Sequence, residues 1–268
     1  MSSIISAPSL APAVKKGSTP LVEMEGISKI YQTGTIALQD VNLSIPEGEF
    51  VSFVGPSGCG KSTIFRLIAG LGDPTSGKMR LMGMDPVEAR KQSDISFVFQ
   101  DATLLPWCKV IDNVTLPMEL RKVPKQERLD KAMHVLEMVG LQDYAQALPR
   151  QLSGGMKMRV SIARALASEP KLLLMDEPFG ALDEMTRQTL QDELLGIWQK
   201  DKKMTVLFVT HNVFEAVYLS TSIVVMTSRP GKIAETIPVP VPFPRNESFR
   251  TTSEFSQLVG QVSDVLHH

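Results

Sequence analysis

The sequence predicts an α/β fold with a mainly parallel sheet. Strand-sized apolar runs alternate with helical segments along most of the chain, which is the pattern of strands joined by crossover helices. Four of these runs end in polar or glycine-rich residues, and such sheets bind ligands beyond the carboxyl ends of their strands. Residues from about 107 to 168 are helical in pattern and lie between strands, so they could form a separate helical lobe.

Composition narrows the classes of protein to which the chain can belong. The 268 residues carry 28 basic and 29 acidic side chains, so the net charge of −1 gives no electrostatic case for nucleic acid as the main partner. Two cysteines, Cys59 and Cys108, are too few for a disulfide framework and fit a reducing compartment. No apolar run approaches the roughly 18 residues of a membrane helix.

The first hundred residues contain a leader and a set of strands. Residues 1–20 are rich in Ser, Ala and Pro and lack the pattern of a signal peptide, so we expect a flexible leader. Segments 21–31 and 36–45 alternate apolar and polar residues like half-buried strands, whereas 49–55 is a continuous apolar run typical of a strand covered on both faces. A helix is predicted from Gly60 to Leu71, closed by Gly70 and Gly72. Short strands are expected at 77–83 and 95–100, the second of them buried.

The β/α alternation resumes after the helical lobe. The sequence predicts strands at 171–178, 205–211 and 222–228, with helices at about 184–202 and 213–219 between them. The segment 237–245, "IPVPVPFPR", has too many prolines for an inner strand. A final amphipathic helix has one apolar face, formed by Phe255, Leu258, Val259, Val262 and Leu266. We therefore expect a main domain over 21–240 and a C-terminal extension over 241–268.

The strongest motif is the loop "GPSGCGKST", which joins a buried strand to a helix. It fits G-x-x-x-x-G-K-[ST] at every defined position and lies in the structural context that this phosphate-binding motif requires. Lys61 would reach the β- and γ-phosphates, and the Ser62 hydroxyl would bind Mg²⁺. A glycine-rich turn with a chance lysine is the weaker alternative. The predicted nucleotide-binding residues of this loop are Gly55, Pro56, Ser57, Gly58, Cys59, Gly60, Lys61, Ser62 and Thr63. We expect the Cys59 thiol itself to be tolerated rather than catalytic.

Polar residues at three further strand ends complete the predicted catalytic edge. Asp176 ends one strand and can hold Mg²⁺ through water, while Glu177 can polarise the attacking water. Gln100 can touch both the metal and the water, and His211 could contact the γ-phosphate or hold the water. Taken singly, these residues could be solvated acids, a surface glutamine and a structural histidine. Their common position at one edge favours the functional interpretation.

Two further features lie outside these strand ends. Tyr31 begins the turn "YQTG", where an aromatic ring could stack on a purine, although an exposed hairpin tyrosine explains it nearly as well. In "LSGGMKMRV", Ser153 can cap a helix, and Gly154 and Gly155 bring backbone N–H groups close to an anion. The chain thus carries two receptors of the phosphate-binding type, far apart in sequence.

In order, these motifs resemble the ATP-binding subunit of ABC transporters. The resemblance covers roughly residues 21–230 and rests on the turn aromatic, "GPSGCGKST", the strand-end Gln, "LSGG", "LLLMDEP", "ALD" and the strand-terminal His. It implies Mg-ATP binding and Glu177 as catalytic base. The expected fold is therefore a P-loop NTPase core with a mainly parallel sheet, an N-terminal antiparallel β subdomain and an inserted α-helical lobe at about 101–168.

The same resemblance accounts for the two receptors. In this family two copies pack head to tail, so that the "LSGG" of one chain closes over the ATP held by the phosphate loop of the other. Asp183, in "ALD", would sit between the two sites. The chain has Met156 where the family usually has Gln, and Met158 also departs from the pattern, which puts polar contacts from those two side chains in doubt; we expect them to serve packing.

A finer resemblance concerns the transported cargo. The segments "FQDATLLPWCKVIDNV", "LSGGM" and "TSRPGKIAETIPVPVPFPR" are similar to the bacterial importers for nitrate, sulfonates, taurine and bicarbonate. This implies a peripheral protein on the cytoplasmic face of the cell membrane that works with an integral membrane permease and, indirectly, with an extracytoplasmic substrate-binding protein. In "DATLLPWCKV", Leu104, Leu105 and Trp107 would be exposed and receive a helix of the permease, or alternatively pack inside the helical lobe.

Two other functions compete with transport as explanations of these motifs. A kinase or GTPase leaves "LSGG" unexplained, and the chain has no N-K-x-D guanine motif. A non-transport ABC ATPase acting on nucleic acid or the ribosome usually fuses two such units or inserts a long coiled coil, and this sequence shows neither.

Overall fold

The computed structural model describes residues 20–92, 94–180, 182–201 and 203–267. The predicted leader, apart from Pro20, and Ala181 of "ALD" lie outside the described residues, as does His268. Within this part of the chain, no helix is both long and apolar enough to span a bilayer.

The molecule is built on two sheets. The larger sheet has six strands in the order β5-β6-β7-β3-β8-β9, and its first five strands run parallel. The antiparallel edge strand β9 pairs with β8. The bounds are Phe50–Val54 for β3, Ile95–Val98 for β5, Leu172–Asp176 for β6, Thr205–Val209 for β7, Ser222–Met226 for β8 and Ile233–Pro238 for β9. The strands β3, β6 and β7 are apolar almost throughout because both of their faces are buried.

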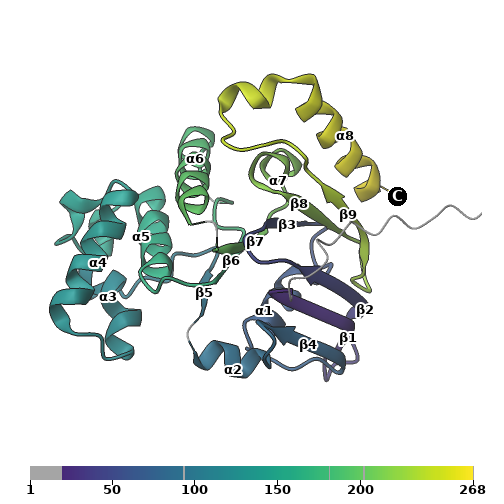
Figure 1. Ribbon diagram of the computed structural model, residues 1–268, viewed down its shortest axis with the longest axis horizontal. Helices are drawn as coiled ribbons and strands as arrows, with labels where there is room; N and C mark the ends of the chain where they lie inside the picture. The colour runs from purple at the N-terminus through teal and green to yellow at the C-terminus, as the bar shows by residue number, and fades with distance from the viewer. Residues whose placement is uncertain (1–19, 93, 181, 202, 268) are drawn as a thin grey trace, which may run out of the picture.

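The second sheet is antiparallel, with the order β2-β1-β4. It consists of β1 (Val22–Ile30), β2 (Ile36–Ile45) and β4 (Ser76–Leu81), and Figure 1 shows it beside α1 and the larger sheet. Because one face of this sheet packs on the core and the other meets solvent, its strands carry mixed burial patterns. The alternation of apolar and polar residues in segments 21–31 and 36–45 therefore reflects half-buried strands, as predicted.

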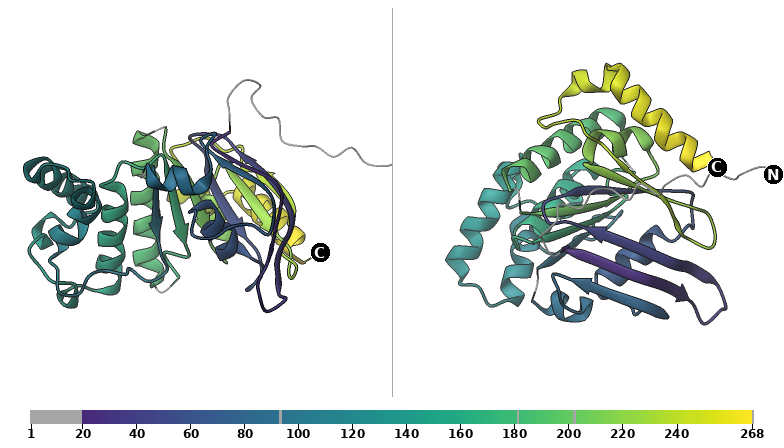
Figure 2. Two further views of the ribbon diagram at one scale, coloured as in Figure 1. Left: turned by 90° about the horizontal axis from the view of Figure 1, so that it is seen from below. Right: turned by 45° about the vertical axis from the view of Figure 1, so that its right-hand side comes forward.

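Helices cover the larger sheet and form a lobe at one end of the molecule. The lobe contains α3 (Val110–Leu120), α4 (Lys125–Met138) and α5 (Gly154–Leu166), which lie together at the left of Figure 1 and in both views of Figure 2. The remaining helices are α1 (Lys61–Ile68), α2 (Pro86–Lys91), α6 (Glu184–Lys200), α7 (Val213–Leu219) and α8 (Ser253–His267). The predicted α/β fold class, with its parallel core sheet, antiparallel N-terminal sheet and helices, is confirmed.

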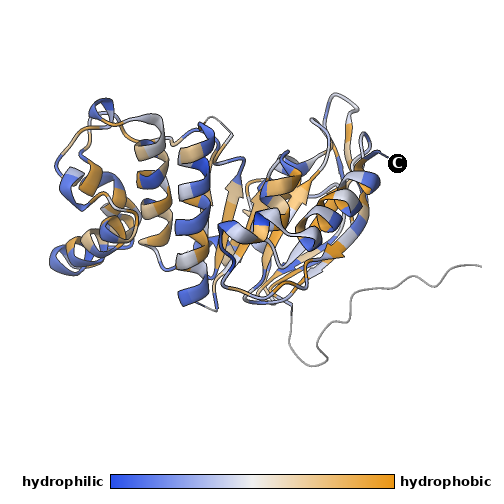
Figure 3. Ribbon diagram, turned by 90° about the horizontal axis from the view of Figure 1, so that it is seen from above, coloured by the Kyte–Doolittle hydropathy of each residue, from blue (hydrophilic) through white to orange (hydrophobic). Residues whose placement is uncertain are grey.

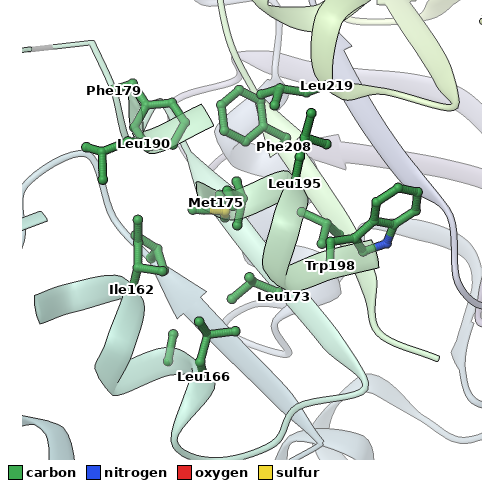
Figure 4. Packing of buried hydrophobic residues seen from close by; sticks show 14 of the residues in the cluster. Ile162, Leu166, Leu173, Met175, Phe179, Leu190, Leu195, Trp198, Phe208 and Leu219 are labelled. Atoms are coloured by element: carbon green, nitrogen blue, oxygen red, sulfur yellow. The ribbon is translucent and has the colours of Figure 1, made fainter. Parts of the chain in front are cut away.

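The core fills the space between the larger sheet and its helices. Figure 3 shows strongly hydrophobic strands beside helices that carry both hydrophobic and hydrophilic residues. In Figure 4, side chains from α5, β6, the turn after β6, α6, β7 and α7 meet in one cluster, labelled Ile162, Leu166, Leu173, Met175, Phe179, Leu190, Leu195, Trp198, Phe208 and Leu219. Met158 is buried and Met156 is half-buried against the same cluster, which confirms that both methionines serve packing.

Two sequence predictions were wrong in part, and one strand was not predicted. The helix expected over 60–71 ends at Ile68, because Gly70 adopts φ +61° and the amides of Gly70 and Leu71 bond back to Leu67 O and Arg66 O. The strand at 95–100 is not buried, since β5 is an edge strand with three of its four residues only half-buried. The strand β9 was missed, because its sequence, "IAETIP", lacks an apolar run.

The C-terminal segment returns to the main core. Phe255 and Val262 of α8 are buried, and Leu258, Val259 and Leu266 pack against the same cluster, so the predicted apolar face is confirmed. The proline-rich segment begins within β9, of which Ile237 and Pro238 are the last two residues, and β9 is an edge strand, where a missing amide donor is tolerated. The boundary at residue 240 stays a prediction.

Candidate functional site

The phosphate-binding loop joins the central strand β3 to α1. Gly58 and Gly60 adopt φ values of +75° and +100°, which favour glycine. A Cβ on Gly60 would also lie 2.6 Å from Leu38 Cδ2 and 2.9 Å from Ala37 O, so glycine allows the loop to pack against β2. Cys59 is buried and its side chain lies against Gly55, which agrees with a packing role for the thiol.

Lys61 is the cation at the centre of this loop. Its Nζ donates hydrogen bonds to Gly55 O at 2.6 Å and Pro56 O at 3.0 Å, and lies 3.7 Å from Cys59 Sγ. These contacts fix the ammonium group inside the ring of loop carbonyls. The loop thus brings a positive charge and the backbone donors of the α1 N-terminus to one place, which is suited to an anion.

A cavity of about 300 Å³ opens over the loop. It is lined by Tyr31, Thr35, Ile36, Ala37, Ser57, Gly58, Gly60, Lys61, Ser62, Thr63, Glu177 and Arg229. The lining comes from both sheets, since residues 31–37 belong to the antiparallel sheet and its hairpin while the phosphate loop and Glu177 belong to the parallel sheet. Residues far apart in the chain therefore meet at one concave surface.

Asp176 ends β6 next to the first turn of α1. Burial raises the pKa of its carboxyl group above the usual range, while the hydrogen bond with Ser62 opposes that rise. A half-buried carboxylate beside a serine hydroxyl offers the oxygen ligands that Mg²⁺ prefers. Within the described residues, no cluster of three or more His, Cys, Asp or Glu side chains could hold a metal ion. Mg²⁺ needs no such cluster, because it usually combines one or two carboxylates with substrate phosphates and water.

Glu177 follows Asp176 at the end of β6 and has a left-handed backbone conformation. It adopts φ +47°, and its amide donates to Val209 O at 3.0 Å, the terminal residue of β7. Its Oε2 lies 3.4 Å from Nδ1 of His211, the side chain of which is exposed. Glu177 and His211, which were predicted at the ends of two different strands, are therefore in contact.

Gln100 lies close to the same carboxylate. A Cβ added to Gly180 would lie 3.8 Å from Gln100 Nε2 and 4.0 Å from Glu177 Oε2, so both groups approach the same glycine. The parallel order β5-β6-β7-β3 brings the four predicted strand ends to one edge of the sheet. The structure therefore gathers Gln100, Asp176, Glu177, His211 and the phosphate loop, as expected.

Tyr31 lies at the far wall of the cavity. Its hydroxyl is 3.3 Å from Thr63 Oγ1, and Lys29 Nζ lies 5.6 Å from its ring centroid. The ring is partly exposed, at 40% of its residue surface. It is therefore available for stacking at the end of the cavity near α1.

The "LSGG" segment lies elsewhere. Ser153 caps α5 by accepting the Met156 amide at 3.3 Å, which confirms the predicted cap, but none of Ser153, Gly154 and Gly155 lines the cavity. Gly155 packs against α6, since a Cβ there would lie 2.7 Å from Thr186 Cγ2. Asp183 caps α6 through the Thr186 amide at 3.0 Å, and that hydrogen bond lowers the pKa of Asp183.

Two residues near the site were missed in the sequence. Arg229 lines the cavity from the loop after β8, and Glu215 of α7 is buried close to His211. Burial raises the pKa of Glu215, and its Oε1 accepts a hydrogen bond from Gln191 Nε2 at 2.8 Å. Glu215 is the one charged residue in the otherwise mainly apolar helix "VFEAVYL", and that pattern could have indicated it. Arg229 was part of the segment "TSRPG", which supported the resemblance to importers but was not assigned to the site.

Comparison with known proteins identifies the family. A family model described as "ABC transporter" matches residues 38–180. An uncharacterized ABC transporter ATP-binding protein of Methanocaldococcus jannaschii is 48% identical over 91% of each chain. The aliphatic sulfonates import ATP-binding protein SsuB of Bacillus licheniformis is 44% identical over 85% of this chain and 86% of its own. A solved dimeric ATP-binding cassette in a post-hydrolysis state, bound to ADP and Pi, is 35% identical and covers 82% of this chain and 100% of its own, with a TM-score of 0.73. The chain thus belongs to the ABC transporter family, in which it is an ATP-binding ATPase.

Proposed function

We propose that this ATPase energises a membrane importer for a small anion, with aliphatic sulfonates as the first candidate. The proposal for the cargo is supported by the SsuB relatives, which are 44% and 41% identical to the chain. Nitrate, taurine and bicarbonate remain the other candidate cargoes. The ATP-binding domain would span 21–240, with its helical lobe at about 101–168 and the C-terminal extension beyond it.

The contact between Glu177 and His211 carries the proposed chemistry. Glu177 would accept the proton of the attacking water, and His211, at 3.4 Å from the Glu177 carboxylate, would hold that carboxylate and contact the γ-phosphate. Lys61 and the loop amides would bind the phosphate chain, while Tyr31 would stack on the adenine. The hydrolysis would then take place where the cavity meets the carboxyl ends of β6 and β7.

Mg²⁺ would be held by Ser62, Asp176 and Gln100. The hydrogen bond between Ser62 and Asp176 supports this assignment, because it puts a hydroxyl and a carboxylate side by side at the edge of the cavity. Bound there, the ion would neutralise charge on the phosphates. Ser62 and Asp176 would also orient the phosphate chain toward Glu177.

The functional unit would be a head-to-tail dimer. Each chain has a nucleotide cavity and, apart from it, a capped helix N-terminus at Ser153–Gly155 with no nucleotide of its own to bind. In a two-fold assembly, this helix would close over the ATP of the partner, with Asp183 between the two sites. The dimeric state of the solved relative supports the arrangement.

A mixing experiment tests the shared site. Lys61→Ala removes the phosphate-binding cation, and Ser153→Arg puts bulk and charge where the partner's nucleotide would dock. Each homodimer should be inactive, whereas a mixed dimer has one site with an intact Lys61 from one chain and an intact Ser153 from the other. Some ATPase activity should therefore return after confirmed subunit exchange. Activity that stays at the level of the separate variants would reject the shared site.

The partner in the membrane would be an integral permease, so the protein would be peripheral at the cytoplasmic face of the membrane. In the segment proposed to meet it, Trp107 is 75% exposed. The expectation that Leu104 and Leu105 are exposed as well was wrong, because both are half-buried and Leu104 packs on the core. The docking surface would thus be centred on Trp107 rather than on three apolar side chains.

The cargo is tested in the cell, because the permease and an extracytoplasmic binding protein would select it. A strain that lacks this gene should fail to grow with an alkanesulfonate as the only sulfur source and should grow normally on sulfate. Complementation with the wild-type gene should restore growth, and complementation with Lys61→Ala should not. Normal growth of the deletion strain on alkanesulfonates, together with a defect on nitrate, taurine or bicarbonate, would reassign the cargo.

A further inference from the structure

The loop that follows β8 packs against the phosphate-binding loop. It has the sequence "TSRPG", residues 227–231, and brings Arg229 to the wall of the nucleotide cavity. We propose that Arg229 is a second cationic ligand of the nucleotide and binds its phosphate chain together with Lys61. The proposal rests on the assignment of this cavity to the nucleotide.

The loop is held rigidly on both sides. Gly231 donates its amide to Ala37 O at 3.1 Å, and its carbonyl accepts the amide of Gln39 at 3.0 Å. A side chain at Gly231 would collide with the carbonyl oxygen of Cys59, so the backbone of this loop touches the backbone of the phosphate loop. Thr227 closes the turn, because its amide donates to Lys232 O at 3.0 Å and its Oγ1 accepts the amide of Lys232 at 3.2 Å. The position of Arg229 is therefore determined by contacts with both β2 and the phosphate loop.

The guanidinium group lies directly over Gly58. A Cβ on Gly58 would be 3.1 Å from Arg229 Nη2, 3.5 Å from Nε and 3.7 Å from Cζ, so the planar group occupies the space that a side chain would take. Gly58 is consequently constrained twice, by its φ of +75° and by Arg229. This places the cation over the backbone of the phosphate loop, in the lining of the same cavity as Lys61.

Among the residues that the structure describes, Arg229 has no partner for its charge. In the described part of the chain, its guanidinium takes part in no ion pair and no side-chain hydrogen bond, and the residue is exposed. Two carboxylates, Glu177 in the wall and Asp176 beside Ser62, lie elsewhere around the same cavity. An unpaired, positioned guanidinium over a phosphate loop is suited to a phosphate, because its fork of donors matches two phosphate oxygens.

The chemistry of the cavity favours phosphate over base as the partner of Arg229. Tyr31, the available stacking surface, contacts Thr63 in the first turn of α1, whereas Arg229 lies over Gly58 on the preceding loop. The two side chains thus reach the cavity at different points of the motif. A nucleotide with its base on Tyr31 and its phosphates on the loop would bring the phosphates to Arg229.

Equilibrium binding of ADP by the purified full chain tests the assignment. Arg229→Met keeps the length of the side chain and removes the charge, so we expect the Kd for ADP to rise about tenfold. Arg229→Lys should recover part of the affinity, because it restores a point charge without the planar fork. The matched control is Lys232→Met, which removes a neighbouring exposed cation that does not line the cavity and should leave the Kd unchanged.

Two further measurements identify the group that Arg229 binds. If it binds phosphate, the dependence of the Kd on salt concentration should be weaker in Arg229→Met than in the wild type. A Kd that rises with unchanged salt dependence would overturn the phosphate assignment in favour of contact with the base or ribose. Gly231→Ala, which displaces the loop but retains Arg229, should weaken ADP binding in the same direction.

Lys61→Ala distinguishes a failure of the Arg229 assignment from a failure of the assignment of the cavity to the nucleotide. If this variant loses ADP binding while Arg229→Met stays within about twofold of the wild type, the role of Arg229 is rejected and the nucleotide cavity stands. If Lys61→Ala binds ADP as the wild type does, the cavity itself has been assigned wrongly. Thermal unfolding of every variant establishes that it is folded.

Discussion

Arg245→Met should destabilise the protein strongly, although Arg245 lies outside the nucleotide cavity. The Arg245 guanidinium is buried where the proline-rich segment passes the end of α7. It donates hydrogen bonds at 2.8–3.4 Å to the carbonyl oxygens of Val217, Tyr218, Ser220, Val239 and Val241. The same group lies 4.0 Å from the ring centroid of Phe243. One side chain therefore satisfies the end of a helix and the chain that crosses it.

The expected loss in the free energy of unfolding is smaller than the summed free energies of these hydrogen bonds. Five hydrogen bonds to a charged group, at about 1.5–3 kcal/mol each, would exceed the whole stability of many domains. Removal of the cation also removes its cost of burial, a cost large enough to lower the pKa of Arg245 to about 10. That cost is several kcal/mol per buried ion. We therefore expect a net loss of about 3–5 kcal/mol, or a fall in Tm of roughly 10 °C.

Denaturant unfolding, followed by the fluorescence of Trp198, measures this loss. Trp198 is a suitable probe because its ring packs edge-on against Phe243 at 4.9 Å. The matched control is Arg250→Met, which loses one side-chain hydrogen bond to Gln191 and a stacked contact with Tyr218 and should cost about 1 kcal/mol. An Arg245→Met protein within about 1 kcal/mol of the wild type would refute the reasoning, since the orphaned carbonyls would then have cost nothing.

Three further predictions concern catalysis, docking and pH. Glu177→Gln should keep ATP binding, trap an ATP-bound dimer on size exclusion and slow turnover by about 10²–10⁴-fold; near-normal hydrolysis would remove Glu177 from the role of base. Trp107→Glu should fold normally, because the side chain is 75% exposed, and should co-purify poorly with the permease; unchanged recovery would reject the docking surface. Burial raises the pKa of Glu215, so the native state binds more protons than the unfolded chain above the ordinary carboxyl range, and stability falls as pH rises through that window. Glu215→Gln should therefore raise Tm at neutral pH relative to the wild type, with the difference shrinking as pH falls; a constant difference would exclude titration of Glu215 as its cause.

The parts of the site that follow local rules were readable in the sequence. The phosphate loop, the Ser153 cap and the strand-end residues each depend on a short motif within a single turn or strand, and the structure has all of them where the motifs indicated. Helix α7 was predicted at its observed bounds, and in the structure Asn212 caps it by accepting the Glu215 amide. Such features depend on residues that are neighbours in the chain.

The features that were missed depend on tertiary contacts. The edge position of β5 follows from the strand order and cannot be read from "ISFV", which is as apolar as an inner strand. Arg229 reaches the cavity only because Gly231 packs on Cys59 and Ala37, two contacts between distant segments. The burial of Arg245 likewise depends on where the chain crosses α7.

The central place of β3 has a consequence for the order in which the protein can be made. This strand carries the phosphate loop, yet within the described ranges it pairs only with β7 and β8. Its flanking bonds from Gly48 to Thr205 and from Phe50 to Thr221 join residues 157 and 171 positions apart. A ribosome-bound chain that has not reached β7 has no strand to pair with β3. Contacts of such long range close slowly. Nucleotide binding should accordingly be one of the last properties that a nascent chain acquires. Until then the apolar strand β3 would be exposed and available to chaperones.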